Sequence, residues 1–398
     1  MKSWIELDEE RLRHNFGVFQ SVVRGAAGQD AAVLAVVKAN AYGHGLEHSA
    51  RALAGTGAEW LGVTGVEEGQ RVRRVLREGG VGKPSQPRIL VMCGISEEDA
   101  AAVAAEELTP VVWSLEQVSW LSAAVAAGKL LRVCVEIDSG MTRQGVRPGS
   151  ELRELITAIR NTKGLQLDGV MTHFASAEVA DSSQTASQKS AFEGALEDIR
   201  AIGITPAWIS VGNTSGVDLE DDTEPMAVWA ARLAQGIGAR PLVRAGLAMY
   251  GYALPVEGLA AHSRLAERLQ QVMTWKAKVI GLEDIAVGAA VGYNGKFVAV
   301  HPMRLALIAV GYADGLRRDL SSTNQTPGGW MMVRGQRAPI VGRISMNLTT
   351  VDVTGIDGIR LGDEAIVLGE GISAKDHAQL AGTIAYEILC GVRAEEKV

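Results

Sequence analysis

The feature that most constrains the fold is a series of eight short apolar segments in the first 250 residues, separated by stretches rich in Ala, Leu, Glu and Arg. The segments are uninterrupted runs of apolar residues, a pattern typical of parallel strands that are buried on both faces. Helices are expected between them, for example at Glu97–Glu107, Glu116–Ala127 and Gln188–Ile202. Eight strand–helix units over about 240 residues have the size of a (β/α)8 barrel, with a doubly wound sheet as the alternative. The expected strands are Val33–Lys38, Trp60–Thr64, Arg88–Cys93, Thr109–Trp113, Leu131–Ile137, Leu167–His173, Trp208–Val211 and Leu242–Arg244.

The character of the sequence changes after Gly251, where helical stretches shrink and β-rich segments separated by Gly, Asp and Asn take over. This pattern predicts a second, mostly β domain. We therefore predict an α/β protein with a barrel at residues 8–257 and a β-rich domain at residues 258–398, which the N-terminal strand within residues 1–7 joins. The linker is expected within Pro255–Ala266. The expected strands of the second domain are Val272–Ile280, Arg304–Val310, Trp330–Val333, Pro339–Ile344, Leu348–Val353 and Glu364–Leu368.

The composition argues against several classes of protein. With 398 residues, 47% hydrophobic and 21% charged, the chain can bury the cores of about two domains. The net charge is −7 and no Lys/Arg run occurs, which argues against a nucleic-acid partner. The sequence shows neither an 18-residue apolar run nor a signal peptide, so we expect no membrane partner and a cytoplasmic location. Three widely spaced cysteines and no zinc-ligand spacing predict reduced thiols and no metal.

Polar residues stand where several of the expected barrel strands end. Lys38, His173 and Arg244 end three of these strands, and Asn213 and Thr214 follow a fourth. Reacting groups of barrel enzymes lie at this end of the strands, although loop starts are generally polar. Lys38 is the most informative, because a nearly buried ammonium group is costly unless it is bonded or neutralised. A Schiff base between its amine and an aldehyde cofactor would solve that problem.

The segment Ala35–Gly45, which reads Ala-Val-Val-Lys-Ala-Asn-Ala-Tyr-Gly-His-Gly, resembles the cofactor-lysine signature of the alanine racemases. These enzymes use pyridoxal 5'-phosphate (PLP) and combine a (β/α)8 barrel with a β domain. The number and order of the further similar segments make the match strong. These segments are Asp138–Gly145, Met171–Ala175, Val243–Gly251, Gly292–Asn294, Gly311–Gly315, Gly342–Met346 and Thr383–Glu387.

The resemblance implies a two-base mechanism that interconverts L- and D-alanine and supplies D-alanine for peptidoglycan. Lys38 would hold PLP and act as the base on the D-face of the substrate. Tyr293 would be the base on the L-face, contributed by the other subunit of a homodimer. Arg143 and the backbone of Met346 would bind the substrate carboxylate.

The resemblance also implies how the cofactor is held. Arg244 would face the pyridine nitrogen of PLP, and His173 would link Arg244 to Tyr293. An arginine there keeps its proton, so the pyridine nitrogen should stay unprotonated, which suppresses protonation at the wrong carbon. The residues expected around the phosphate are Tyr42, Thr214, Gly246, Leu247 and Tyr386, and Asn213 is expected as a further cofactor-binding residue.

The chain departs from the family pattern at positions that border the substrate. Glu136 stands where many members have a carbamylated lysine, and we expect its carboxylate to supply the anion that orients Arg143. Asn347 replaces a frequent Asp, and Tyr312 is expected nearby. These changes leave open a racemase of broader specificity that also accepts serine. Two other classes remain: a barrel-fold PLP decarboxylase, which typically has an acid at the ring nitrogen, and a PLP carrier without the second domain.

The first testable prediction concerns the lysine that binds PLP. If the protein is loaded with PLP and reduced with borohydride, peptide mapping should find the cofactor on Lys38, because this lysine follows a buried strand in the matching motif. A label on Lys276 or on any other lysine would contradict the prediction.

Overall fold

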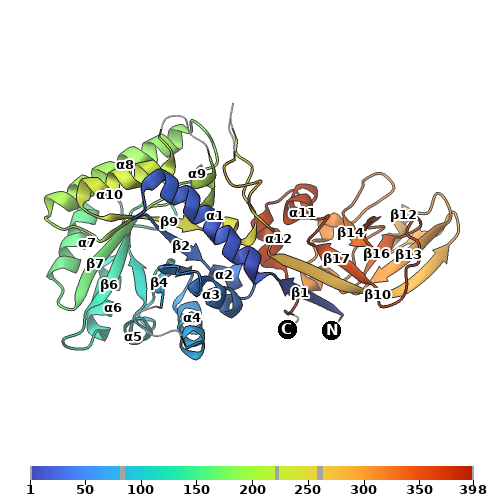
Figure 1. Ribbon diagram of the computed structural model, residues 1–398, viewed down its shortest axis with the longest axis horizontal. Coiled ribbons are helices and arrows are strands. Elements are labelled where there is room, and N and C mark those ends of the chain that lie inside the picture. The colour runs from blue at the N-terminus through green and yellow to red at the C-terminus, as the bar shows by residue number, and fades with distance from the viewer. Residues whose placement is uncertain (1, 81–85, 220–223, 258–262, 397–398) are drawn as a thin grey trace. The chain divides into compact units, whose positions relative to one another are not determined.

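The computed structural model describes residues 2–80, 86–219, 224–257 and 263–396 (Figure 1). The chain forms two compact units. One comprises Glu10–Ala41 and Leu46–Gln270, and the other comprises Met1–Glu9, Tyr42–Gly45 and Gln271–Val398. The boundary that we placed between residues 257 and 258 borders the segment 258–262, which lies outside the described residues, so it stays a prediction.

The first unit is a closed barrel of eight parallel strands in chain order, which confirms the predicted fold class. The barrel closes where the first strand pairs with the last, with Ala32 opposite Leu242 and Ala35 opposite Ala245. Nearly all strand residues are buried, as the apolar runs predicted. The strands are β2 Ala32–Val36, β3 Trp60–Val63, β4 Arg88–Val91, β5 Thr109–Val112, β6 Leu131–Glu136, β7 Leu165–Met171, β8 Trp208–Ser210 and β9 Arg240–Ala245.

Helices surround these strands because each has one apolar stripe to bury. Helix α7, for example, buries Leu152, Leu155, Ile156 and Ile159. The expected helix at 188–202 begins earlier, at Ser183, because the Ser182 hydroxyl accepts a hydrogen bond from the Thr185 N–H at 3.2 Å. The helices are α1 Glu9–Ala27, α3 Leu46–Ala54, α4 Val66–Glu78, α5 Ala100–Ala105, α6 Leu115–Ala124, α7 Ser150–Asn161, α8 Ser183–Ala201, α9 Thr214–Asp218, α10 Met226–Ile237 and the 3-10 turn η2 Leu247–Tyr250. The short segment α2 Lys38–Tyr42 has left-handed backbone angles and is a turn.

The second unit is built on an antiparallel sheet in the order β15-β14-β17-β10-β13-β16, with β1 also paired to β10. The long strand β10 is the centre of this sheet (Figure 1). The expected N-terminal strand is β1, whose Ile5 lies opposite Trp275 of β10. The strands are β1 Ser3–Leu7, β10 Met273–Ile285, β11 Ala290–Val291, β12 Phe297–Val298, β13 Met303–Ile308, β14 Trp330–Val333, β15 Gln336–Pro339, β16 Thr349–Asp352 and β17 Glu364–Leu368.

One expected strand of this unit is wrong. The predicted strand is Pro339–Ile344, but β15 spans Gln336–Pro339. Beyond it Ile340 forms a single bridge with Val351, the Val341 N–H donates to the Thr350 carbonyl at 2.9 Å, and the residues after Val341 are irregular. The backbone N–H groups of Gly342 and Ile344 donate to the hydroxyls of Ser322 and Ser321, at 3.1 and 3.0 Å, instead of to a neighbouring strand. Apolar composition could not reveal these side-chain acceptors.

The sequence also gave no sign of the helices that follow β17. Helix α11 spans Ala374–Ala381 and helix α12 spans Ala385–Gly391. The start of α11 is fixed by a capping box between Ser373 and Asp376. Among the described residues, no helix has both the length and the apolar character needed to cross a membrane.

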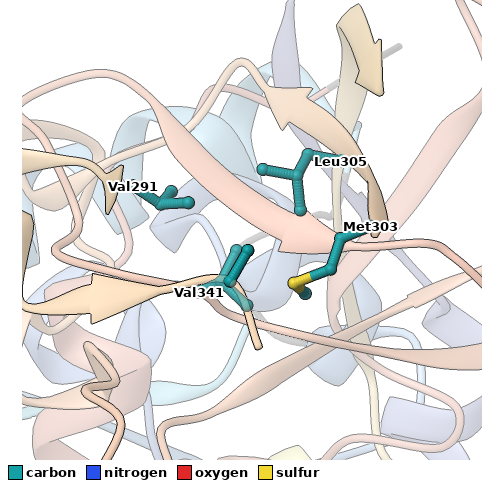
Figure 2. Packing of buried hydrophobic residues seen from close by; sticks show 5 residues of the cluster. Val291, Met303, Leu305 and Val341 are labelled. Atoms are coloured by element: carbon teal, nitrogen blue, oxygen red, sulfur yellow. The ribbon is translucent and has the colours of Figure 1, made fainter. Parts of the chain in front are cut away.

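A small apolar cluster lies beside strand β11 of the second unit. Val291, Met303, Leu305 and Val341 pack together with Ala299 and are all buried (Figure 2). Val291 ends β11 and lies two residues before Tyr293. The cluster therefore fixes the base of the turn that carries one of the expected catalytic residues.

Candidate active site

The carboxyl ends of the barrel strands bring several of the expected site residues to one end of the barrel. Lys38 lies two residues beyond β2 and is half-buried. Glu136 is the last residue of β6, His173 lies two residues beyond β7, and Arg244 lies near the end of β9. Because all eight strands are parallel, these side chains share the mouth where barrel enzymes hold their substrates.

The backbone after Lys38 has an unusual conformation. Ala39, Asn40, Ala41 and Tyr42 all have left-handed φ angles, between 53° and 55°. Each such residue costs about 1–2 kcal/mol unless it is glycine. The Asn40 side chain stabilises the turn by accepting a hydrogen bond from the Leu46 N–H at 3.0 Å. Strained backbone of this kind is concentrated at functional sites, and here it redirects the chain directly after the lysine.

Arg244 is a buried cation that bridges three strand ends. Its Nη1 donates to the carbonyl and hydroxyl of Ser210, both at 3.0 Å, and its Nη2 donates to the Thr172 carbonyl at 2.8 Å. Nη2 also lies 3.1 Å from Nδ1 of His173. All four partners are uncharged, and the Nε–H has no hydrogen-bond partner in the described part of the chain. This donor is therefore available to a ligand in the mouth.

His173 is held neutral beside Arg244. Burial, followed by the nearby cations Arg244, Arg143 and Lys38, lowers the pKa of His173 to about 3. A guanidinium can only donate, so Nδ1 of His173 accepts from Arg244 and the ring proton is on Nε2. His173 can thus pass a hydrogen bond onward but is not an acid at neutral pH.

The loops after β8 and β9 form a pair of polar turns. Asn213 caps α9 by accepting from the Gly216 N–H at 2.9 Å. The buried Thr214 hydroxyl accepts from the backbone N–H groups of Gly246 and Ala248 at 3.2 and 3.3 Å. With both lone pairs engaged, this hydroxyl still has its own proton to donate.

Tyr42 and Tyr386 lie together in the second unit. Their ring centroids are 5.7 Å apart and their planes are tilted by 41°. The segment of Tyr42 approaches α12 so closely that a Cβ on Gly43 would stand 2.3 Å from the Leu389 carbonyl oxygen. Burial, with further contributions from Tyr386 and Cys390, raises the pKa of Tyr42. Its phenol therefore keeps its proton and can act as a donor.

Tyr293, Tyr312 and Met346 stand on adjacent turns of the second unit and are exposed to 63%, 43% and 56%. The Tyr312 N–H donates to the Ser345 carbonyl at 3.1 Å, which holds the turn η4 Tyr312–Asp314 against the loop of Met346. Tyr293 begins η3 Tyr293–Gly295, and Asn347 is exposed beside Met346. Large exposed side chains gathered in this way typically mark an interaction surface.

Arg143 stands on the turn that follows β6, and its side chain is exposed. The sequence predicts that the Glu136 carboxylate orients Arg143, and this role stays a prediction. The buried Glu136 carboxylate accepts its hydrogen bond from the side chain of Gln144, and no hydrogen bond or ion pair joins Glu136 to Arg143 among residues 86–219. The turn directs Gln144 inward and Arg143 outward. Burial raises the pKa of the Glu136 carboxyl, and the Arg143 guanidinium acts against that rise at longer range.

Three residues of the site, Gln144, Ser210 and Thr172, were not revealed by the sequence, since nothing in their spacing distinguished them from ordinary loop residues.

The structure places the expected site residues in two sets. The barrel holds Lys38, Glu136, Arg143, His173, Asn213, Thr214, Arg244, Gly246 and Leu247. The second unit holds Tyr42, Tyr293, Tyr312, Met346, Asn347 and Tyr386.

Comparison with known proteins settles the family. The model of the alanine racemase N-terminal domain matches residues 7–254, and that of the alanine racemase C-terminal domain matches residues 272–397. The chain belongs to the alanine racemase family. Members of this family depend on PLP, and the barrel followed by a mostly β domain is their fold.

Individual members of the family match this chain over almost its whole length. The alanine racemases of Syntrophobacter fumaroxidans and Geobacter sulfurreducens are both 35% identical to it, over 98% and 97% of this chain and 95% and 94% of their own. Among solved structures, the alanine racemase of Streptomyces coelicolor has a TM-score of 0.81 at 29% identity, covering 99% of this chain and 97% of that one. The alanine racemase of Bartonella henselae with covalently bound pyridoxal phosphate has a TM-score of 0.80 at 25% identity, covering 100% and 99%.

The second testable prediction concerns the charge of His173. Nitrogen NMR of the histidine-labelled holoenzyme should show His173 neutral and protonated on Nε2 down to pH 5, because its pKa of about 3 lies below the ordinary value of about 6.5. In an Arg244→Gln variant the pKa should rise, since a nearby cation is removed. A wild-type His173 that takes up a proton between pH 5 and 7 would show the idea to be wrong.

Proposed function

We propose that this protein interconverts L- and D-alanine with PLP bound to Lys38 and Tyr293 as the opposing base. The observation that carries the proposal is Arg244. A buried, permanently charged guanidinium with a free Nε–H, beside a neutral histidine in a barrel mouth that contains a lysine, suits a cofactor whose ring nitrogen accepts a hydrogen bond. PLP, when bound, makes the α-proton of an amino acid acidic by withdrawing electrons from that carbon.

The residues present fit this cofactor at both of its ends. At the ring end, the Nε–H of Arg244 has no partner within the described chain and would donate to the pyridine nitrogen. At the phosphate end, the Thr214 hydroxyl has used its lone pairs and has a proton to give. Tyr42 keeps its phenolic proton, and Asn213, Gly246, Leu247 and Tyr386 complete the group that would hold the phosphate.

The proposed substrate contact is Arg143. Its exposed guanidinium can bind a carboxylate through two parallel hydrogen bonds. The backbone of Met346 would add a further donor for the same carboxylate, with Tyr312 and Asn347 nearby. A carboxylate fixed in this way keeps the α-carbon of the substrate in one place while its proton is exchanged.

Racemisation needs a proton to leave one face of the α-carbon and another to arrive on the opposite face. The Lys38 amine would hold the proton on the D-face, and the Tyr293 phenol would hold it on the L-face. The Nε2–H of the neutral His173 would donate to the Tyr293 oxygen, which connects that oxygen with the Arg244 cation. A phenolate is favoured when a cation acts on it through such a hydrogen bond.

Arg244 also separates this proposal from a PLP decarboxylase of the same architecture, which typically has an acid at the ring nitrogen. Arginine keeps its proton at every physiological pH, so it does not hand one to the ring. The second unit with Tyr293 and Met346 likewise speaks against a simple PLP carrier. A racemase of broader specificity remains the second candidate, because Asn347 and Glu136 border the substrate.

We further propose that D-alanine made by this enzyme supplies peptidoglycan synthesis in the cytoplasm. The support for this proposal is the chemistry alone, since D-alanine is the product that a wall precursor requires. A strain that lacks the protein should then need D-alanine for growth. Normal growth without it would contradict the biosynthetic role.

The third testable prediction is the activity itself. The PLP-loaded protein should convert L-alanine to a racemic mixture, as followed by circular dichroism. Tyr293→Phe should lower kcat by about 10²- to 10⁴-fold, the usual effect of losing a general base. Lys38→Ala should abolish the activity, because it removes the cofactor link and a base together. No racemisation of alanine, or faster racemisation of serine, would refute the assignment.

The fourth testable prediction concerns a homodimer in which each active site is shared. The exposed Tyr293, Tyr312 and Met346 suit contact with a second copy of the chain. Inactive Lys38→Ala and Tyr293→Phe proteins should therefore regain activity when their subunits are exchanged, since each mixed dimer would contain one intact site. A mixed dimer that stays as inactive as its parents would exclude a shared site.

A further inference from the structure

Glu136 is an acid in an unusual setting. It ends β6 inside the barrel mouth and is only 2% exposed. Burying a carboxylate is costly unless hydrogen bonds replace the lost water. In the described residues, its side chain has one such bond, in which Oε2 accepts from Nε2 of Gln144. Burial raises the pKa of Glu136, whereas the bond from Gln144 lowers it, ahead of the more distant Arg244 and Arg143.

Gln144 links two strand ends that are not neighbours in the sheet. Its Nε2 donates one hydrogen to Glu136 at the end of β6 and the other to the Met92 carbonyl, at 3.0 Å, directly after β4. Both amide hydrogens are thereby used, and the side chain is fixed in position. The residue next to it in sequence is Arg143.

Arg143 and Gln144 lie on the turn between Glu136 and Val146. Other hydrogen bonds fix the two ends of this turn and its first half. The Val146 N–H donates to the Glu136 carbonyl, and the Asp138 N–H donates to the Val146 carbonyl, each at 2.9 Å. Oδ1 of Asp138 accepts from the N–H groups of Gly140, Met141 and Thr142, each at 3.0 Å. Among the described residues, the side chain of Gln144 is thus the tertiary anchor of the second half, where Arg143 stands.

We propose that Gln144 is a positioning residue for substrate binding, which fixes Arg143 against the barrel by tying the turn to Glu136 and Met92. This proposal rests on the proposed role of Arg143 in holding the substrate carboxylate. A long arginine side chain loses much rotational freedom when it binds, and an anchored backbone limits that loss. Glu136 then acts through Gln144 and not through direct contact with Arg143.

The proposal differs from one in which the negative charge of Glu136 alone steers Arg143. If the charge alone acts on Arg143, Glu136→Gln should weaken binding of the substrate carboxylate, and Gln144→Met should leave it unchanged. In the anchor model, Glu136→Gln keeps an acceptor oxygen for Gln144, so it weakens binding of the carboxylate less than Gln144→Met does. Gln144→Met has a similar shape and no donor, so it releases the turn.

The experiment measures KM and kcat for L-alanine with the PLP-loaded enzyme. It also measures the inhibition constant of propionate, which is alanine without its amino group and reports carboxylate binding alone. Gln144→Met should raise both KM and the propionate constant about ten- to a hundredfold, the range for loss of a hydrogen bond to a charged group, with kcat within about threefold. In Gln144→Lys, the ammonium group can donate to the same two oxygens, so most of the binding of alanine and propionate should be kept. This variant also tests the proposal if Gln144→Met does not fold.

A matched control is Gln117→Met. Gln117 is a buried amide whose Oε1 accepts from the Trp113 N–H at 2.7 Å, and it forms the capping box of α6 with Ser114. Its loss should therefore lower Tm and leave the KM for alanine unchanged. The anchor model is overturned if Gln144→Met binds alanine and propionate like the wild type, or if Glu136→Gln weakens them while Gln144→Met does not. A wild-type protein that does not racemise alanine would instead refute the proposed function.

Discussion

The buried guanidinium of Arg244 ties together the carboxyl ends of three barrel strands. Its Nη2 donates to the Thr172 carbonyl, and its Nη1 donates to the Ser210 carbonyl, which also accepts from the Thr172 N–H at 3.3 Å. Buried carbonyls at the ends of β7 and β8 thereby have hydrogen-bond partners. The same group contributes to the electrostatics of the mouth, since after burial it is the largest influence that lowers the pKa of His173, and it also lowers that of Glu136. A single cation therefore serves both the packing of the strand ends and the protonation of the groups around them.

The rest of the site follows from how the chain leaves each strand. After β2 the backbone takes a left-handed turn directly beyond Lys38, and after β8 and β9 two turns share the Thr214 hydroxyl. These turns use uncommon backbone angles and hydrogen bonds to side chains, which a rigid barrel can hold in place. The barrel thus forms a rigid scaffold, and the short loops at the strand ends carry the site residues, as is typical of this architecture.

The turn after β6, which carries Arg143 and Gln144, shows how a buried acid is accommodated. A buried glutamate needs a donor, and Gln144 provides it from within the turn. The hydrogen bond satisfies the acid and at the same time joins the turn to β4 through Met92. In the second unit, an apolar cluster around Val291 fulfils a comparable supporting role for the turn of Tyr293.

The sequence by itself determined the barrel, because eight continuous apolar runs separated by helical stretches leave few other ways to bury both faces of each strand. It also determined which residues stand at the strand ends, since a position in the chain fixes a position on a parallel strand. Lys38, His173 and Arg244 could be identified in this way, and the motifs around them pointed to the family.

The tertiary structure decided the rest. The left-handed turn after Lys38, the neutral state of His173 and the bond between Glu136 and Gln144 depend on groups that come from distant strands. The displaced strand at Gln336–Pro339 has the same origin, because hydroxyls of Ser321 and Ser322 from another loop take the hydrogen bonds of the segment that follows it. Hydrophobic pattern is a local property of the chain, whereas hydrogen-bond partners and burial arise only when the chain is folded.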